Sequence, residues 1–147
     1  MKFLADDMLG TLARWLRILG YNTSYPRAKD DEMIEIAEKE GRVILTRDKK
    51  VAKRYKNSLY IESDKLDEQL EQVMCTFKLG IKNSMTLCSI CNVELEDVEK
   101  EEVKEKVPLR IYEFHEQFWH CPECGRYYWQ GSHWERIMER VMRLRIE

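Results

Sequence analysis

The sequence lacks two features that would assign it to a broad class of protein at once. No stretch of its 147 residues approaches 18 consecutive apolar side chains, so we expect no transmembrane helix. It also lacks an excess of one charge, because 25 basic and 27 acidic residues leave a net charge of −2. That balance excludes a generally basic protein that coats nucleic acid, although a local basic patch can still bind it.

A secretory signal and a flexible linker are absent as well. Met1–Ala5 is followed at once by Asp6 and Asp7, which leave no apolar core for a signal peptide. There is no Gly/Ser-rich linker, and 44% hydrophobic residues exclude a disordered chain. We therefore expect a soluble, cytoplasmic protein without membrane association, built as one domain or two small ones.

The first eighty residues alternate between short apolar runs and amphipathic segments. Helical spacing places the leucines at positions 9, 12, 16 and 19 on one buried stripe. This alternation predicts βαβ units, a mainly parallel sheet and an α/β fold. The predicted strands cover residues 3–5, 21–25, 42–46 and 59–61, and the predicted helices cover residues 8–19, 31–40 and 66–77.

The composition changes after Gly80. Residues 94–106 are dense in Glu and Lys, which predicts an exposed hairpin or loop. Ser132 followed by Glu135 has the spacing of a capping box and predicts a helix that extends to about Leu144. We therefore predict two units, residues 1–80 and residues 81–147, the second ending in a helix.

Four of the five cysteines form two C-x2-C pairs. Cys88 and Cys91 make the first pair, Cys121 and Cys124 make the second, and 29 residues separate them. Two such turns can surround one Zn²⁺ with four thiolates, which leaves no open position and predicts a structural site. A redox dithiol and an iron–sulfur cluster are the alternatives. The remaining Cys75 lies in a predicted helix, where we expect a small buried apolar side chain.

Two acidic residues lie where ligands bind in α/β proteins, and a third could face the same crevice. Asp6 and Asp48 follow predicted strands, and Asp31 begins the helix between them. Carboxylates that meet at one edge repel each other unless a cation neutralises them, and oxygen ligands suit Mg²⁺ or Mn²⁺. Such an ion can activate a water against a phosphodiester. The alternative is structural, with Asp31 as a helix cap and Asp48 as a turn residue.

Basic residues surround the same edge. Arg14 and Arg17 are three residues apart on the first helix, away from its leucines, so we expect both to point outward. Arg27 and Arg47 could approach the same rim. Guanidinium groups suit phosphates, which makes Arg14, Arg17 and Arg47 candidate binding residues for a phosphate-rich ligand such as RNA. A solvated helix face is the alternative.

Aromatic residues are concentrated in the second half of the chain, beside His133 and the second cysteine pair. They could stack on unpaired RNA bases, or they could pack the small ribbon against its neighbour, which is the more common role. The aromatic residues concerned are Tyr127, Tyr128, Trp129 and Trp134.

Three separated segments form a set of motifs, namely Phe3–Asp6 with Met8–Gly20, then Leu45–Asp48, and then Cys121–Arg126 with Tyr128–Trp134. Together they resemble the Mut-seven C-terminal RNase domain family, a PIN-like nuclease branch with an added zinc ribbon. The resemblance implies a PIN-like parallel sheet with flanking helices, a C-terminal zinc ribbon and helix, and metal-dependent RNA cleavage. By motif position, Asp6, Asp31 and Asp48 would be its acidic residues, with Asp64 or Asp67 as candidates for a fourth.

The sequence therefore predicts a divalent-metal-dependent endoribonuclease, a hydrolase whose partner is RNA and whose cofactors are structural zinc and catalytic magnesium or manganese. A non-catalytic RNA-binding or ribosome-associated module with a degenerate site is the alternative, and an RNA-processing complex is a further candidate partner. A protein-interaction adaptor built around the ribbon is a third reading, which predicts no salt-sensitive affinity for RNA.

Overall fold

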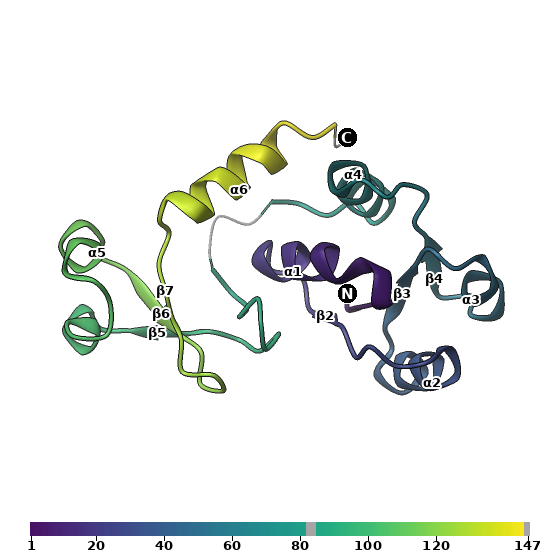
Figure 1. Cartoon of the computed structure of the whole chain (residues 1–147), viewed down its shortest axis with the longest axis horizontal. Coiled ribbons are helices and arrows are strands. Elements are labelled where there is room, and N and C mark those ends of the chain that lie inside the picture. Colours follow the sequence, from purple (N-terminus) through teal and green to yellow (C-terminus); the bar gives the residue numbers. More distant parts are fainter. Residues whose placement is uncertain (82–84, 146–147) are drawn as a thin grey trace.

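A four-stranded parallel sheet forms the centre of the first half of the chain. The structure, a computed structural model, describes residues 1–81 and 85–145. The strands are β1 (Phe3–Ala5), β2 (Thr23–Ser24), β3 (Val43–Thr46) and β4 (Ser58–Tyr60), in the order β2-β1-β3-β4 (Figure 1). All neighbouring strands are parallel, so their carboxyl ends meet at one edge. The predicted α/β class with a parallel sheet is confirmed.

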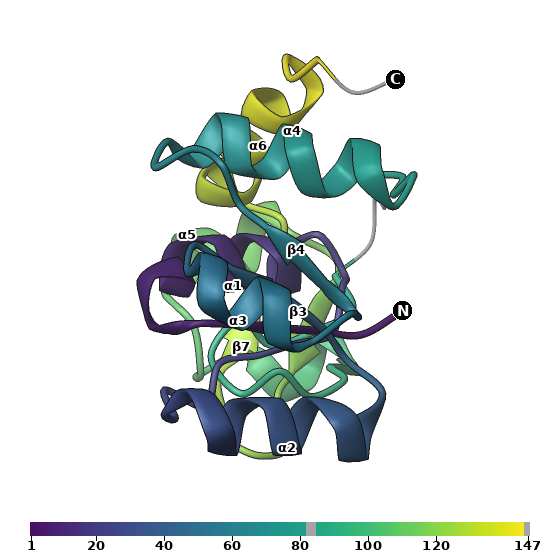
Figure 2. The ribbon, with the colours of Figure 1, turned by 90° about the vertical axis from the view of Figure 1, so that its right-hand side faces the viewer.

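Helices cover both faces of this sheet. Successive side chains of a strand point to opposite faces, and here both sets are buried. One face packs against α1 (Gly10–Ile18) and α4 (Leu66–Thr76), and the other packs against α2 (Asp30–Glu40) and α3 (Lys49–Arg54). In Figure 2, α4 lies above the sheet and α2 below it. The first face buries Phe3, Ala5, Val43 and Leu45, and the second buries Leu4 and Ile44.

The leucine stripe of the first helix is confirmed. A short 3-10 helix, Asp7–Leu9, precedes α1, and the side chain of Asp6 caps it by accepting a hydrogen bond from the Met8 amide. All four leucines are at most 1% exposed. They anchor α1 to the sheet, and the chain that leaves β1 at Asp6 therefore runs directly into a fixed helix.

A three-stranded antiparallel sheet forms the second half. Its strands are β5 (Glu96–Val98), β6 (Phe118–His120) and β7 (Tyr127–Tyr128), in that order. The structure differs from the loop or hairpin predicted for residues 94–106. Part of this segment forms β5, which pairs with β6, and β6 begins twenty residues after β5 ends. The connection contains a 3-10 helix, Lys100–Val103, and α5 (Leu109–Phe114). No helix was expected at α3 or α5.

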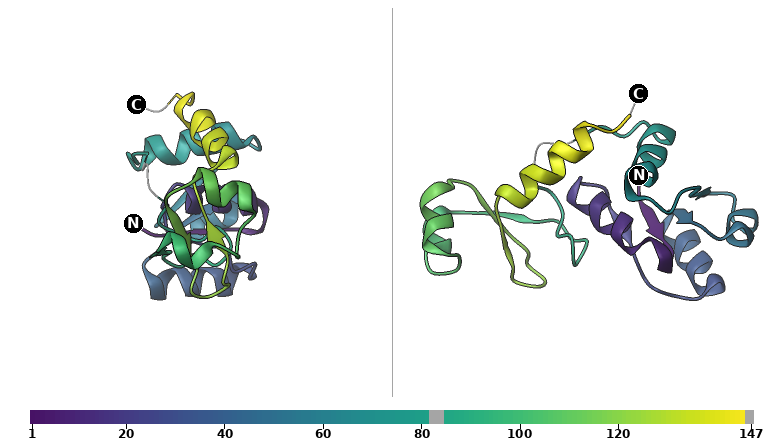
Figure 3. Two further views of the ribbon diagram at one scale, coloured as in Figure 1. Left: turned by 90° about the vertical axis from the view of Figure 1, so that its left-hand side faces the viewer. Right: turned by 45° about the horizontal axis from the view of Figure 1, so that its top comes forward.

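The C-terminal helix α6 (Ser132–Met142) returns to the first half (Figures 1 and 3). Ile137, Met138 and Val141 join the core that α1 and α4 also line. Arg140 on the same helix lies 5.0 Å from the ring centroid of Trp15 on α1 and donates to Asp67 on α4 at 2.7 Å. Its contacts therefore hold α6 against both helices.

Two local expectations are wrong. Ser132 is not the N-cap of α6, because Gly131 precedes the first turn and no side chain caps it. The hydroxyl of Ser132 instead accepts a hydrogen bond from Arg136. Cys75 is exposed rather than buried. The boundary near residue 80 stays a prediction. Among the described residues, no helix has the length and apolar character needed to span a membrane.

Arg17 joins the two halves of the molecule. Its Nε donates to the Thr23 carbonyl at 2.8 Å, and its Nη1 donates to the carbonyls of Ser89 and Ile90 at 3.0 and 3.1 Å. Burial lowers the pKa of this guanidinium. The expectation that both arginines point outward therefore holds for the exposed Arg14 and is wrong for Arg17.

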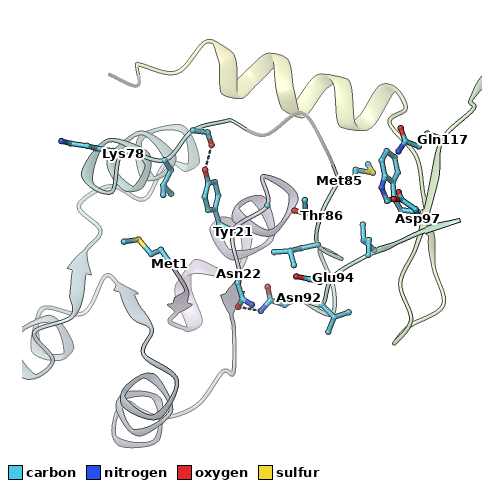
Figure 4. A pocket seen from close by; sticks show the side chains of 17 residues that line it. Met1, Tyr21, Asn22, Lys78, Met85, Thr86, Asn92, Glu94, Asp97 and Gln117 are labelled. Carbon is cyan, nitrogen blue, oxygen red and sulfur yellow. Dashed lines mark hydrogen bonds between the residues drawn. The ribbon is translucent and has the colours of Figure 1, made fainter.

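Asn92 makes the second connection between the halves. Its Oδ1 accepts from the Thr23 amide at 3.0 Å, and its Nδ2 donates to Asn22 at 2.9 Å, a bond drawn in Figure 4. Asn22 Oδ1 also accepts from Arg42 at 2.6 Å. The turn that contains Asn92 is thus hydrogen-bonded to β2, which is an edge strand of the parallel sheet.

We predict that Arg17→Met destabilises the protein and that Arg14→Met does not. Hydrogen bonds from a charged donor contribute about 1.5–3 kcal/mol, so the loss at Arg17 should lower the free energy of unfolding by about 2 kcal/mol. Exposed substitutions such as Arg14→Met usually change it by less than about 0.5 kcal/mol. Urea denaturation of both variants measures the difference, and equal midpoints would show that Arg17 does not join the halves.

Candidate functional site

Asp6 lies at the carboxyl end of β1, and its carboxylate is held by the chain around it. One oxygen accepts from the Met8 amide at 3.1 Å. The other accepts from the Thr46 hydroxyl at 2.5 Å and from the Arg47 amide at 3.0 Å. The residue is only 9% exposed. These bonds fix the position of the carboxylate at the edge where β1 and β3 both end.

Asp48 is connected to Asp6 through Thr46. The Asp48 amide donates to the Thr46 hydroxyl at 2.9 Å, and that hydroxyl donates to Asp6. The Asp48 carboxylate accepts from the Lys50 amide at 2.8 Å and caps α3. Sequence reasoning missed Thr46, although its place between a buried strand and Asp48 was a usable signal. The structure thus brings two of the three predicted acids to one edge.

Asp31 lies in the first turn of α2 and has a different environment. Its side chain is 89% exposed and forms an ion pair with Arg54 at 2.6 Å. The hydrogen bond to Asp31 raises the pKa of Arg54. Within residues 1–81 and 85–145, the carboxylates of Asp6, Asp31 and Asp48 do not form one cluster of converging ligand atoms. A shallow hollow beside them is lined by Asp7, Arg27, Ala28, Lys29, Asp30, Asp31 and Arg54.

The predicted RNA-binding arginines are divided between two environments. Arg47 lies at the acidic edge, and its guanidinium donates to the carbonyls of Ile61 and Glu62 beyond β4, both at 3.3 Å. Arg14 is exposed on α1. Arg17 lies against the turn at Ser89 and Ile90, as described above. The RNA-binding role of all three stays a prediction.

The four paired cysteines converge on one point. Their Sγ atoms all lie within 4.8 Å of one another, and Cys88 and Cys124 are separated by 3.9 Å. With Zn–S bonds of about 2.3 Å, tetrahedral geometry places sulfurs about 3.8 Å apart. The arrangement can therefore hold a metal such as zinc. In the part of the chain that the structure describes, no other group of three or more Cys, His, Asp or Glu ligands converges in this way.

Each cysteine pair forms the same turn. The amide of the second cysteine donates to the first sulfur at 3.4 Å, in both Cys88–Cys91 and Cys121–Cys124. The residue that follows donates its amide to the first cysteine's carbonyl at 2.9 Å. That residue is Asn92, with φ +60°, or Gly125, with φ +79°. Glycine and asparagine are the residues that tolerate this left-handed backbone.

The thiols of this quartet are not equivalent electrostatically. A backbone hydrogen bond from Arg126 lowers the pKa of Cys124 to about 6, whereas burial raises the pKa of Cys91 to about 12. The Tyr128 hydroxyl lies 3.0 Å from Cys88 Sγ. Four thiolates this close repel one another unless a cation neutralises them, so the donor set fits a metal ion.

Packing between aromatic residues stabilises the ribbon, by which we mean strands β5, β6 and β7 together with the two cysteine turns. The rings of Tyr127 and His120 have centroids 4.8 Å apart, and those of Trp129 and Phe118 have centroids 6.4 Å apart. His133 is exposed at the start of α6. Packing thus accounts for Tyr127 and Trp129.

A hollow of about 1030 Å³ lies between the two halves of the molecule (Figure 4). Its charged side chains have both signs, with Lys78 opposed by Glu94 and Asp97. The Tyr21 hydroxyl donates to the Gly80 carbonyl at its rim. With no dominant charge and no converging ligands among its described residues, it presents no clear recognition chemistry.

Comparison with known proteins gave one match. The model of the Mut7-C RNAse domain family matches residues 1–141, which include both the acidic edge and the cysteine quartet. No curated protein and no solved structure matches the chain. The match confirms the resemblance seen in the sequence motifs, and it indicates a nuclease or RNA-related role with RNA as the substrate class.

We predict that Gly125→Ala destabilises the second cysteine turn through its backbone alone. A Cβ at this position would meet no atom within 4 Å, but the φ of +79° costs an L-residue about 1–2 kcal/mol. Gly80→Ala is the matched control, since it also meets nothing within 4 Å and lacks a left-handed φ. Thermal unfolding of the two variants checks this, and equal melting temperatures would contradict it.

Proposed function

The chain belongs to the Mut7-C RNAse domain family, and from this membership we propose that it is a divalent-metal-dependent endoribonuclease. The observation that carries the proposal is the hydrogen-bonded connection from Asp6 through Thr46 to Asp48 at the carboxyl ends of β1 and β3. Ligands of open α/β sheets bind outside these strand ends. Hard carboxylate oxygens in such a position suit Mg²⁺ or Mn²⁺.

Asp6 and Asp48 would hold the ion, and Asp31 would join them. Backbone amides already position the first two carboxylates. The Asp31–Arg54 pair is exposed on both sides, and exposed ion pairs contribute little stability, so a cation can compete for Asp31. When bound, the ion would activate a water against the phosphodiester and stabilise the leaving oxygen. The exposed Arg14, together with Arg47, would orient the RNA phosphates. Arg17 stays a predicted RNA contact, although its guanidinium already donates to the carbonyls of Thr23, Ser89 and Ile90.

We predict that Asp48→Asn abolishes RNA cleavage and leaves the fold intact. Its remaining carbonyl oxygen can still accept the Lys50 amide, so α3 keeps its cap. Loss of a group that only positions a metal ligand costs about 10–100-fold, so loss of a ligand should lower the cleavage rate at least about 100-fold. The measurement is Mg²⁺- or Mn²⁺-dependent cleavage of labelled RNA, with melting temperatures recorded beside it.

Two further variants make this test specific. Asp6→Asn should be equally inactive, although it also changes a buried hydrogen-bond network. Asp7→Asn is the matched control, because Asp7 is the neighbouring acid and is exposed. If Asp48→Asn cleaved RNA at the wild-type rate, the catalytic site would not lie at this edge of the sheet.

A non-catalytic RNA-binding module is the second candidate. It is favoured by one observation, namely that the three described carboxylates do not converge and Asp31 pairs with Arg54. This alternative predicts salt-dependent RNA binding without cleavage in either metal. A protein-interaction adaptor would show neither salt-dependent RNA binding nor RNA cleavage.

We also propose that the cysteine quartet binds one structural zinc ion. Four thiolates complete a tetrahedral shell and leave no position for water or substrate. The supporting observations are the convergence of the four sulfurs and the identical turn at each pair. Zinc would then join the segment before β5 to the segment after β6, which are far apart in the sequence.

We predict one equivalent of zinc in the purified protein and its loss in Cys124→Ser. The serine hydroxyl is a much poorer ligand than a thiolate, so unfolding should also occur at a lower temperature. Elemental analysis measures the metal. Cys75→Ser is the control and should retain a full equivalent, because Cys75 is exposed on α4 and lies outside the quartet. Absence of zinc, or a disulfide within either pair, would contradict the proposal.

A further inference from the structure

A cavity of about 220 Å³ lies where the ribbon and α6 meet α1. Ile18 and Arg14 of α1 form one side, and Tyr127, Trp129 and Trp134 are among the residues that form the other. Pockets for drug-sized ligands usually measure about 300–1000 Å³, so this cavity suits one flat ring system. Figures 1 and 3 show how α6 leaves the ribbon and passes beside α1.

The indole of Trp134 has an unused hydrogen-bond donor. Its Nε1 is buried and has no hydrogen-bond partner in the described part of the chain. A buried donor without a partner is unfavourable, and an indole can only donate. Trp134 Nε1 has almost no exposed surface, so the indole must turn before a ligand can reach this atom. No hydrogen bond made by Nε1 would have to break during that turn. The ligand must therefore supply an acceptor as well as a flat apolar face.

Positive charge lies at one side of this cavity. Arg14 is exposed and, within residues 1–81 and 85–145, makes no hydrogen bond or ion pair. The net charge of −2 provides no general attraction for an anion, so a local cation matters more. Arg14 is eight residues beyond Asp6, across the 3-10 turn and the start of α1. At a rise of about 1.5–2.0 Å per residue, their backbones are separated by no more than about 16 Å. One strand of RNA can therefore contact both.

We propose that this cavity binds an unpaired nucleobase of single-stranded RNA, with Arg14 on the adjoining phosphate. The base would pack among the aromatic side chains and accept a hydrogen bond from Trp134 Nε1. Every nucleobase offers a flat face together with a carbonyl oxygen or an unprotonated ring nitrogen. Aromatic stacking of this kind tolerates any base sequence. The inference rests on the proposed RNA-directed function and adds a base-binding position to it.

The test compares two fluorescein-labelled octamers by anisotropy in buffer without Mg²⁺ or Mn²⁺. One is octauridylate, and the other has the same ribose-phosphate backbone without bases. Stacking of one base contributes enough for the base-free octamer to bind about tenfold more weakly. Equal affinity for the two octamers, or no binding of octauridylate, would overturn the proposal.

Trp134→Phe separates base binding from a structural role. The variant keeps an aromatic ring and loses the N–H, so octauridylate should bind about fivefold more weakly. The melting temperature should fall only modestly, because Phe keeps one ring of a side chain that is partly buried against the core, and the lost donor has no partner in the free protein. Trp15→Phe is the control for affinity, since Trp15 is not among the residues that line the cavity. Unchanged affinity would overturn the proposal, whatever the melting temperature.

Failure of this inference is distinguishable from failure of the nuclease proposal. Base-dependent binding without cleavage in Mg²⁺ or Mn²⁺ would support the cavity and contradict the nuclease. Cleavage that requires Asp48, combined with equal binding of both octamers, would support the nuclease and overturn the base site.

Discussion

Four sulfur atoms that must meet at one point constrain the arrangement of the second half of the chain. The turn from Cys88 to Asn92 carries two of these sulfurs, and it also makes the contacts with the parallel sheet. Arg17 binds carbonyls within the turn, and Asn92 binds Thr23 and Asn22 at the edge strand. Asn92 takes part in both the cysteine turn and the contact with the sheet. Its left-handed φ closes the turn, and its amide side chain reaches β2. The convergence of the sulfurs and the contact between the halves therefore depend on the same five residues.

The same constraint extends to the C-terminal helix. The second cysteine pair leads through β7 into α6, whose apolar residues complete the core over α1 and α4. Two separate anchors thus hold the ribbon, one at the first cysteine turn and one at α6. The cavity beside Trp134 lies between these anchors, so its shape depends on both. A change in the cysteine quartet would be transmitted to the cavity without altering any residue that lines it.

Apolar spacing predicted the elements whose burial depends on their own sequence pattern. It failed for residues that a distant part of the chain covers or contacts. The leucine stripe of α1 follows from apolar spacing, and the burial of β1 and β3 on both faces follows from their unbroken apolar runs. Arg17 has the sequence signature of an exposed helix face, yet the first cysteine turn covers it. Cys75 shows the opposite error, since a cysteine on an amphipathic helix was expected inside and lies outside. Thr46 ends a strand that the sequence predicts, and the pairing of β1 with β3 shows that its hydroxyl joins the Asp6 carboxylate to the Asp48 amide.

The predicted acids differ in how strongly the fold determines their positions. Asp6 is fixed by three hydrogen bonds, two of them from backbone amides, so it needs no reorganisation to act as a ligand. Asp31 is held only by a partner on the surface. A cation at the acidic edge would therefore find Asp6 already oriented and would have to displace Arg54 to recruit Asp31. The Asp31–Arg54 pair is exposed on both sides and contributes little stability, so this displacement would cost little. The fold therefore determines the position of Asp6, whereas a surface ion pair alone holds Asp31.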